Sequence, residues 1–274
     1  MSQTDPSRQF ARMMEQENDR IDLAEAALLI AQTEYPALDL AAELARLDRL
    51  AAQAEIDPAA PPLAHVQSLN DLIFEKEKFS GNEAEYDDPD NSYLNRVLDR
   101  KKGLPITLSL VYTEVARRRG LPIVGVGFPG HFFVKYLNPP EEILIDPYHR
   151  GAIMTTDDCQ AVLETQFGKD AKFDPAYLEA STPKQILARM LNNLKGSYFR
   201  RRIYFKVLLM IELALSIDPG SRQDLRDRGM VYLAMRKYRE AIESFQACLV
   251  LSPEGDPETQ EVLRALQRVR AQMN

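Results

Sequence analysis

The sequence contains no tryptophan, only three histidines and only two cysteines among its 274 residues. The cysteines, Cys159 and Cys248, lie far apart and form no C-x-x-C pair, so neither a disulfide framework nor a cysteine-based zinc site is expected. The N-terminal segment lacks the apolar core of a secretory signal, and charges interrupt every apolar run before it reaches the length of a membrane span. We therefore predict a soluble protein of the cytoplasm.

The chain also lacks an excess of positive charge, because its formal net charge is −7. Such a balance disfavours bulk attraction to nucleic acids or anionic membranes, and we predict neither kind of partner. Three short basic clusters, at residues 100–102, 117–119 and 199–202, are interpreted as solvated faces because no aromatic residues are interleaved with them. A hydrophobic content of 45% and a charged content of 27% are typical of a globular protein of one or two domains.

The first half of the chain shows helical periodicity that later changes to short strands. Residues 21–54 repeat apolar side chains every three to four positions, which predicts paired amphipathic helices. Residues 100–120 predict a buried central helix, with Pro105 in its first turn and Gly120 at its C-terminal cap. Three candidate strands follow, and the short turns between them favour antiparallel pairing, with strands at residues 121–128, 131–136 and 142–145. A turn and a capped helix over 155–167 come next.

From about residue 181 the sequence predicts only helices, and an internal repeat is present. Pro219 and Pro253 close similar phrases and are 34 residues apart, which is the period of the tetratricopeptide repeat. Residues 222–255 match the repeat pattern well, with Cys248 where a small residue is common. The preceding unit departs from it, because Lys195 replaces the small residue at the helix approach. Residues 257–272 predict the first helix of a third unit or a capping helix.

One histidine stands inside an apolar, strand-like stretch, the sequence FPGHFFVKY at residues 128–136. Asp146 ends the next predicted strand, and an antiparallel pair can bring positions 131 and 146 opposite one another. A carboxylate beside an imidazole fixes its tautomer and raises its basicity, as in nucleophile–His–Asp triads. The simpler interpretation is a core histidine that is satisfied by hydrogen bonds, and the residues alone leave both open.

Three phrases carry a resemblance to a known family: NSYLNRVLDRKKGLPITLSLVY (91–112), GLPIVGVGFPGHFFVKY (120–136) and LIDPYHRG (144–151). They resemble the transglutaminase-like core of the papain-like cysteine-protease superfamily. The resemblance is closer still to the SirB-type bacterial proteins, in which tetratricopeptide repeats follow that core. The resemblance implies an α+β transglutaminase-like domain with N-terminal helices over residues 1–180 and an all-α repeat tail over 181–274. It also implies that His131 and Asp146 are the histidine and aspartate of the family's catalytic triad.

The resemblance breaks down at the nucleophile. Active members of the family open the central helix with a cysteine, and here the corresponding residues 105–107 are Pro105, Ile106 and Thr107. Cys159 lies beyond the aspartate on a separate predicted helix, and the motif does not transfer the role to it. A hydroxyl is much harder to ionise than a thiol, so losing the cysteine normally removes covalent catalysis.

We therefore predict a non-catalytic protein that binds a protein or peptide partner through its repeats and its cleft, without a cofactor. Two alternatives remain. The first is a hydrolase or acyltransferase in which Thr107, or Ser109, acts with His131 and Asp146. The second is a metal site formed by His131, Asp146 and His149, although a single D-x-x-H spacing is weak evidence and we assign no metal ligand from the sequence.

Overall fold

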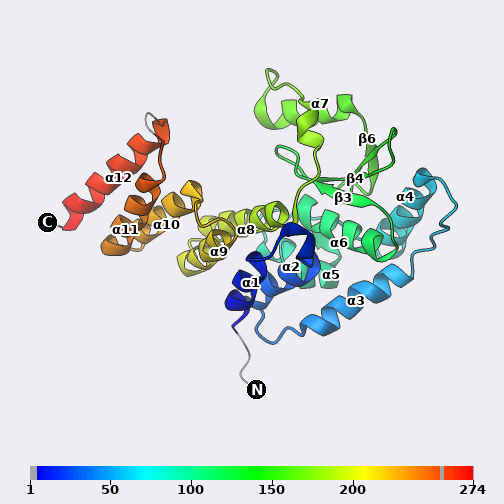
Figure 1. Ribbon diagram of the computed structural model, residues 1–274, viewed down its shortest axis with the longest axis horizontal. Coiled ribbons are helices and arrows are strands. Elements are labelled where there is room, and N and C mark those ends of the chain that lie inside the picture. The colour runs from blue at the N-terminus through cyan, green and yellow to red at the C-terminus, as the bar shows by residue number, and fades with distance from the viewer. Residues whose placement is uncertain (1–4, 254–255, 274) are drawn as a thin grey trace. The chain divides into compact units, whose positions relative to one another are not determined.

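The computed structural model describes residues 5–253 and 256–273 (Figure 1). The chain divides into two compact units between Met190 and Leu191. The first unit combines helices with small β-sheets, and the second consists of helices alone. The predicted α+β core followed by a helical tail is therefore confirmed. Within the described ranges, no helix is both long enough and apolar enough to cross a bilayer.

Four helices precede the core of the first unit: α1 (Pro6–Met14), α2 (Leu23–Gln32), α3 (Leu40–Ala52) and α4 (Pro62–Asn70), the last continuing as the π-helical segment η2 (Asp71–Lys76). Three of them begin after an aspartate whose carboxylate accepts a backbone N–H of the first turn, the preferred way to satisfy a helix start; these aspartates are Asp5, Asp22 and Asp39. The helical pair predicted for residues 21–54 is confirmed by α2 and α3.

The central helix of the first unit is α6 (Pro105–Arg118), and eleven of its 14 residues are buried. It begins with Pro105 and is followed by Gly120 at φ +74°, a conformation that favours glycine, so both predicted ends are confirmed. A helix buried on most sides is apolar around its circumference, which explains the long apolar run in this segment.

A short helix, α5 (Leu94–Arg100), precedes α6, and the parallel strands β1 (Ser80–Gly81) and β2 (Lys102–Gly103) pair beside it. Residues Pro89–Asn91 form a 3₁₀ turn, and Tyr93 takes the N-cap position of α5. This turn places the backbone carbonyl of Asn91 next to the start of α6.

The main sheet has four antiparallel strands in the order of the chain: β3 (Ile123–Val126), β4 (Phe133–Tyr136), β5 (Ile143–Asp146) and β6 (Ala152–Met154). The three predicted strands and their antiparallel pairing are confirmed. The fourth strand was missed, because its three residues are exposed or half-buried and follow a turn with no alternating pattern. The predicted capped helix follows as α7 (Thr156–Phe167), where Thr155 and Asp158 form a capping box.

The register of the sheet corrects one expectation. Val134 pairs with Ile145, so Phe133 rather than His131 lies level with Asp146. His131 sits in the turn before β4, where its backbone N–H donates to the carbonyl of Phe128. The histidine therefore approaches the aspartate from the loop at the end of the sheet and not from a paired strand.

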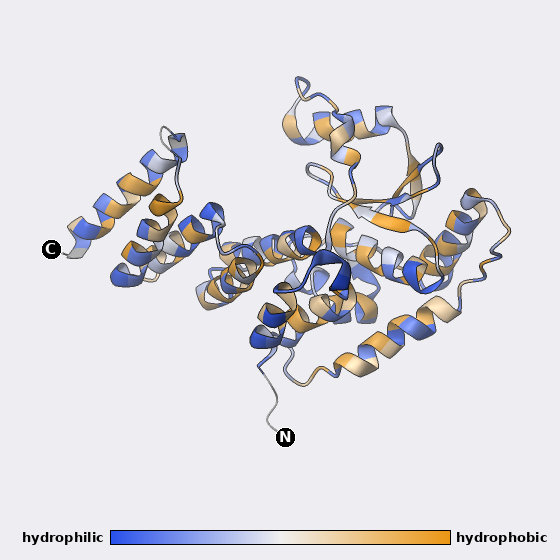
Figure 2. Cartoon of the chain, in the orientation of Figure 1, coloured by the Kyte–Doolittle hydropathy of each residue, from blue (hydrophilic) through white to orange (hydrophobic). Residues whose placement is uncertain are grey.

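The second unit contains the end of α8 (Pro183–Arg200), then α9 (Tyr204–Ile217), α10 (Arg222–Ala234), α11 (Tyr238–Val250) and α12 (Pro257–Met273). Hydrophobic and hydrophilic residues alternate around α10, α11 and α12 (Figure 2). Gly229 of α10 lies against the ring of Phe245 of α11, where an added Cβ would stand 2.5 Å from the ring. The apolar cluster around Phe245 extends into α12 through Val262, Leu266 and Val269. The second predicted repeat thus forms the expected helix pair, and α12 covers it.

Lys195 explains the departure of the first repeat from the usual pattern. Its ammonium group donates to the carboxylates of Asp224 at 2.8 Å and Asp227 at 2.7 Å, both on α10. Burial alone would lower the pKa of Lys195, but the hydrogen bonds to these two carboxylates outweigh it, and the pKa is raised. An ionic bridge between α8 and α10 thus replaces the close approach of small residues.

Candidate functional site

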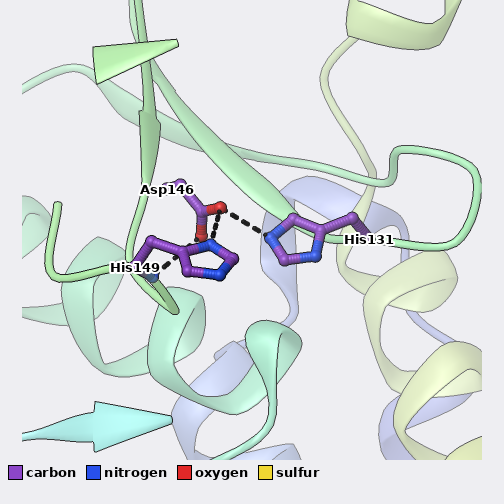
Figure 3. A group of neighbouring side chains, drawn as sticks. All are labelled: His131, Asp146 and His149. Carbon is purple, nitrogen blue, oxygen red and sulfur yellow. Dashed lines mark hydrogen bonds and ion pairs between the residues drawn. The ribbon is translucent and has the colours of Figure 1, made fainter. Parts of the chain in front are cut away.

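The candidate site lies where the turn before β4 meets the end of β5. His131 Nε2 and Asp146 Oδ2 are 2.9 Å apart, and His149 Nδ1 lies 2.7 Å from the same carboxylate oxygen (Figure 3). The Asp146 side chain is 1% exposed, that of His131 is 12% exposed and that of His149 is 60% exposed. The structure therefore brings His131 and Asp146 together as predicted, and adds His149 on the solvent side.

The carboxylate of Asp146 is fixed at both oxygens. Oδ1 accepts the backbone N–H groups of Tyr148 at 2.9 Å and of His149 at 3.3 Å, which leaves Oδ2 for the two imidazoles. Burial raises the pKa of Asp146, but the hydrogen bonds and charges of His131 and His149 outweigh that effect, and the pKa lies below its usual value. The site therefore holds an ionised carboxylate within a largely buried setting.

The turn that carries His149 is held from two sides. Asn70 of α4 donates from Nδ2 to the carbonyl of Gly151 at 3.0 Å and accepts from the hydroxyl of Tyr112 of α6 at 3.1 Å. Gly151 has φ +75° and no space for a Cβ beside Asn70, so only glycine fits there without strain. Tyr148 packs its ring against Gly81 of β1. Sequence reasoning missed Asn70, because its partner Gly151 lies 81 residues further along the chain.

The turn that carries His131 is held by Arg189. The guanidinium of Arg189 donates to the carbonyls of Phe128 at 2.9 Å and of His131 at 2.6 Å, and it lies over the ring of Phe132. Burial lowers the pKa of this arginine. Arg189 is thus a positioning residue that sequence reasoning missed, because it comes from a helix 58 residues further along the chain.

Thr107 and Ser109 do not lie where a catalytic role with His131 and Asp146 would require them. The Thr107 hydroxyl is fully buried, donates to the carbonyl of Asn91 at 2.7 Å and accepts the backbone N–H of Leu104 at 2.9 Å. Ser109 donates to the carbonyl of Phe132 at 3.4 Å. Among the described residues, no hydrogen bond joins either hydroxyl to His131 or Asp146. The Thr107 hydroxyl caps α6, and a role for it as nucleophile stays a prediction without geometric support.

The two thiols and the remaining histidine occupy packing positions. Cys159 of α7 is buried in the apolar cluster above the sheet, and burial, with a contribution from the charge of Asp158, raises its pKa to about 11. Cys248 is buried beside Phe245, and burial raises its pKa as well. His65 is hydrogen-bonded to the hydroxyl of Tyr136 and the carbonyl of Asp57. A thiol with a raised pKa is largely protonated at neutral pH, so neither cysteine supplies a ready nucleophile.

A second candidate site lies in the repeat region. A cavity of about 600 Å³ opens between α8 and α10, and one of about 260 Å³ opens between α10 and α12. Arg226 and Met230 line both cavities, so the two are neighbours, and we call the pair of cavities the repeat groove. Phe199 and Met230 are 50% and 44% exposed there, so the lining offers apolar surface as well as charged groups.

The charged residues of the repeat groove are mostly basic: Lys195, Arg200, Arg226, Arg264 and Arg268, against the acidic Asp227 and Glu261. This is opposite in sign to the net charge of the chain, −7. Lys195 and the cluster that holds Arg200 were noticed in the sequence, but Arg226, Arg264 and Arg268 were missed, because they lie on two helices and form no continuous basic segment. Their helical spacing on the groove side, as in Arg264 and Arg268, was the available signal.

Comparison with known proteins assigns both units. Residues 41–192 match the family model described as the transglutaminase-like superfamily, and residues 194–273 match one described as a tetratricopeptide repeat. The chain belongs to the transglutaminase-like superfamily and carries tetratricopeptide repeats after the core domain.

The similar proteins are bacterial and mammalian. The chain is 32% identical to the UPF0162 protein of Xylella fastidiosa (strain Temecula1) over 86% of both proteins. It is 29% identical to F-box only protein 21 of Mus musculus, over 68% of this chain and 30% of that protein. The crystal structure of menin aligns with a TM-score of 0.45 at 11% identity, over 95% of this chain and 74% of that one, a likeness too distant to carry an argument.

Proposed function

We propose that this chain is a non-catalytic transglutaminase-like protein of the SirB type that binds an acidic segment of a partner protein in the repeat groove. The observation that carries the proposal is the repeat groove itself, which combines exposed apolar side chains with a surplus of basic ones. Tetratricopeptide repeats stack in a row, and the small rotation between neighbouring repeats creates an extended concave surface on which partners bind.

The chemistry of the repeat groove indicates the partner. Arg264 and Arg268 of α12 are both exposed and, among the described residues, neither forms an ion pair. Lys195 and Arg226 are already paired with acidic residues, so they supply less free charge. A peptide with carboxylates facing α12 and an apolar side chain over Met230 and Phe199 is complementary to this arrangement.

The proposal that the core domain is non-catalytic is supported at the position of the missing cysteine. Pro105 and Ile106 offer no nucleophile, and the hydroxyl proton of Thr107 is donated to the backbone carbonyl of Asn91. The His131–Asp146 pair then serves structure or binding. The hydrolase alternative needs a nucleophile within hydrogen-bond reach of His131, about 2.6–3.2 Å.

Charge reversal of the repeat groove tests the proposed function. We expect the double variant Arg264→Glu/Arg268→Glu to bind a fluorescein-labelled acidic peptide at least about tenfold more weakly than the wild type, because two attractive charges become repulsive. Fluorescence anisotropy at low and high salt measures the affinity, and the difference between the proteins should shrink as salt screens the charges.

Arg239→Glu is the matched control, because Arg239 is exposed on α11 and does not line the repeat groove. A lysine-rich peptide of the same length controls for the sign of the charge. Equal binding of the acidic peptide by the wild type and the double variant, or equal binding of both peptides, contradicts the proposal.

A further inference from the structure

We propose that His131, Asp146 and His149 form a binding site for one divalent first-row transition-metal ion. Each residue offers one ligand atom, and all three atoms lie within 4.8 Å of one another. The two imidazole rings point at the same carboxylate oxygen of Asp146 (Figure 3). The site is independent of the repeat groove, and it adds a role that the family's His–Asp pair alone does not have.

The spacing of the three atoms suits a metal ion. Zinc binds imidazole nitrogen and carboxylate oxygen at about 2.0–2.2 Å, which places neighbouring ligand atoms roughly 3–3.5 Å apart. The distances from Asp146 Oδ2 to the two nitrogens, 2.9 and 2.7 Å, are already close to that separation. The His149 side chain is 60% exposed, so it is free to adjust by the remaining fraction of an ångström.

The surroundings hold the ligands as a metal site requires. Asp146 Oδ1 is fixed by two backbone N–H groups, and Arg189 and Asn70 fix the two turns that carry the histidines. Outer contacts of this kind orient the ligands of metal sites and affect metal affinity strongly. A hydrogen-bonded His–Asp pair alone would not require a second imidazole on the same oxygen.

The ligand set indicates the class of ion. Imidazole nitrogen with one carboxylate suits zinc, iron and neighbouring transition metals, whereas calcium and magnesium prefer oxygen ligands alone. Three protein ligands leave at least one coordination position for water or another molecule, as in open rather than purely structural zinc sites. The exposed His149 places that open position on the solvent side of the site.

Zinc binding to the full chain tests this inference. The protein is freed of its purification tag, stripped of metal with a chelator and titrated with Zn²⁺ alone by isothermal titration calorimetry. We expect one zinc ion per chain and a higher melting temperature with zinc, because an ion that binds only the folded state stabilises it. In His149→Ala we expect at least about tenfold weaker binding and no zinc-dependent rise in melting temperature.

His65→Gln is the histidine control. The substitution removes an imidazole, as the ligand variants do, but His65 lies outside the proposed metal site. It should keep full zinc binding if its melting curve shows a folded protein. His131→Gln is the second ligand variant and should lose zinc as His149→Ala does. A wild type that takes up no stoichiometric zinc, or a folded His149→Ala that binds zinc as tightly as the wild type, overturns the inference.

Discussion

Replacing Phe245 with alanine is expected to lower the free energy of unfolding of the repeat region by about 3–5 kcal/mol. Phe245 is fully buried on α11, and its ring fills the space that Gly229 of α10 leaves open. Alanine would leave a cavity between α10, α11 and α12, because the backbone of α10 cannot move in without losing its other contacts. Urea unfolding of the full chain, followed by circular dichroism, measures the effect as a separate or earlier transition.

Phe205→Ala is the matched control for this prediction. Phe205 is the same residue type on α9, but it is 65% exposed, so truncating it should change the stability by no more than about 0.5 kcal/mol. If Phe245→Ala and Phe205→Ala unfold at the same urea concentration, the packing of Phe245 against Gly229 is not what stabilises the helix pair.

Lys195→Ala is expected to lower the stability of the same region by about 2–4 kcal/mol, near the lower end for breaking a buried ion pair. Its side chain is 12% exposed, and its removal leaves the carboxylates of Asp224 and Asp227 side by side without a cation. The partial exposure of Asp227, 27%, keeps the effect below that of a fully buried charge. Chemical unfolding measures this loss.

Adding Asp224→Asn and Asp227→Asn to Lys195→Ala should restore part of the lost stability, because the amides do not repel one another. Arg239→Ala serves as the surface control and should be nearly neutral. A triple variant that is even less stable than Lys195→Ala would show that the ion pairs are not the reason for the loss.

Local sequence signals were sufficient for much of the fold. Pro105 and Gly120 mark the ends of α6, the apolar periodicity of residues 21–54 marks α2 and α3, and the spacing of Pro219 and Pro253 marks the repeat. These signals lie within one element or one repeat period. Strand β6 was missed, because its three residues are exposed or half-buried and carry no alternating pattern.

The candidate site could be predicted only in part, because several of its contacts join residues that are far apart in the sequence. The pairing of His131 with Asp146 was predictable from their type and spacing, but the register that places His131 in the turn before β4 was not. Arg189, Asn70 and the basic residues of the repeat groove meet their partners only in three dimensions. The predicted domain boundary between residues 180 and 181 stays a proposal, and α8 begins shortly after it at Pro183.

The central claim is that the chain acts by binding through its repeats and not by catalysis at the His131–Asp146 pair. The most direct measurement is an anisotropy titration of one acidic peptide against wild type and His131→Ala, with the peptide recovered and weighed by mass spectrometry. The account predicts equal affinity for both proteins and an unchanged peptide. Loss of binding in a folded His131→Ala, or a peptide that the wild type modifies and His131→Ala does not, would contradict it.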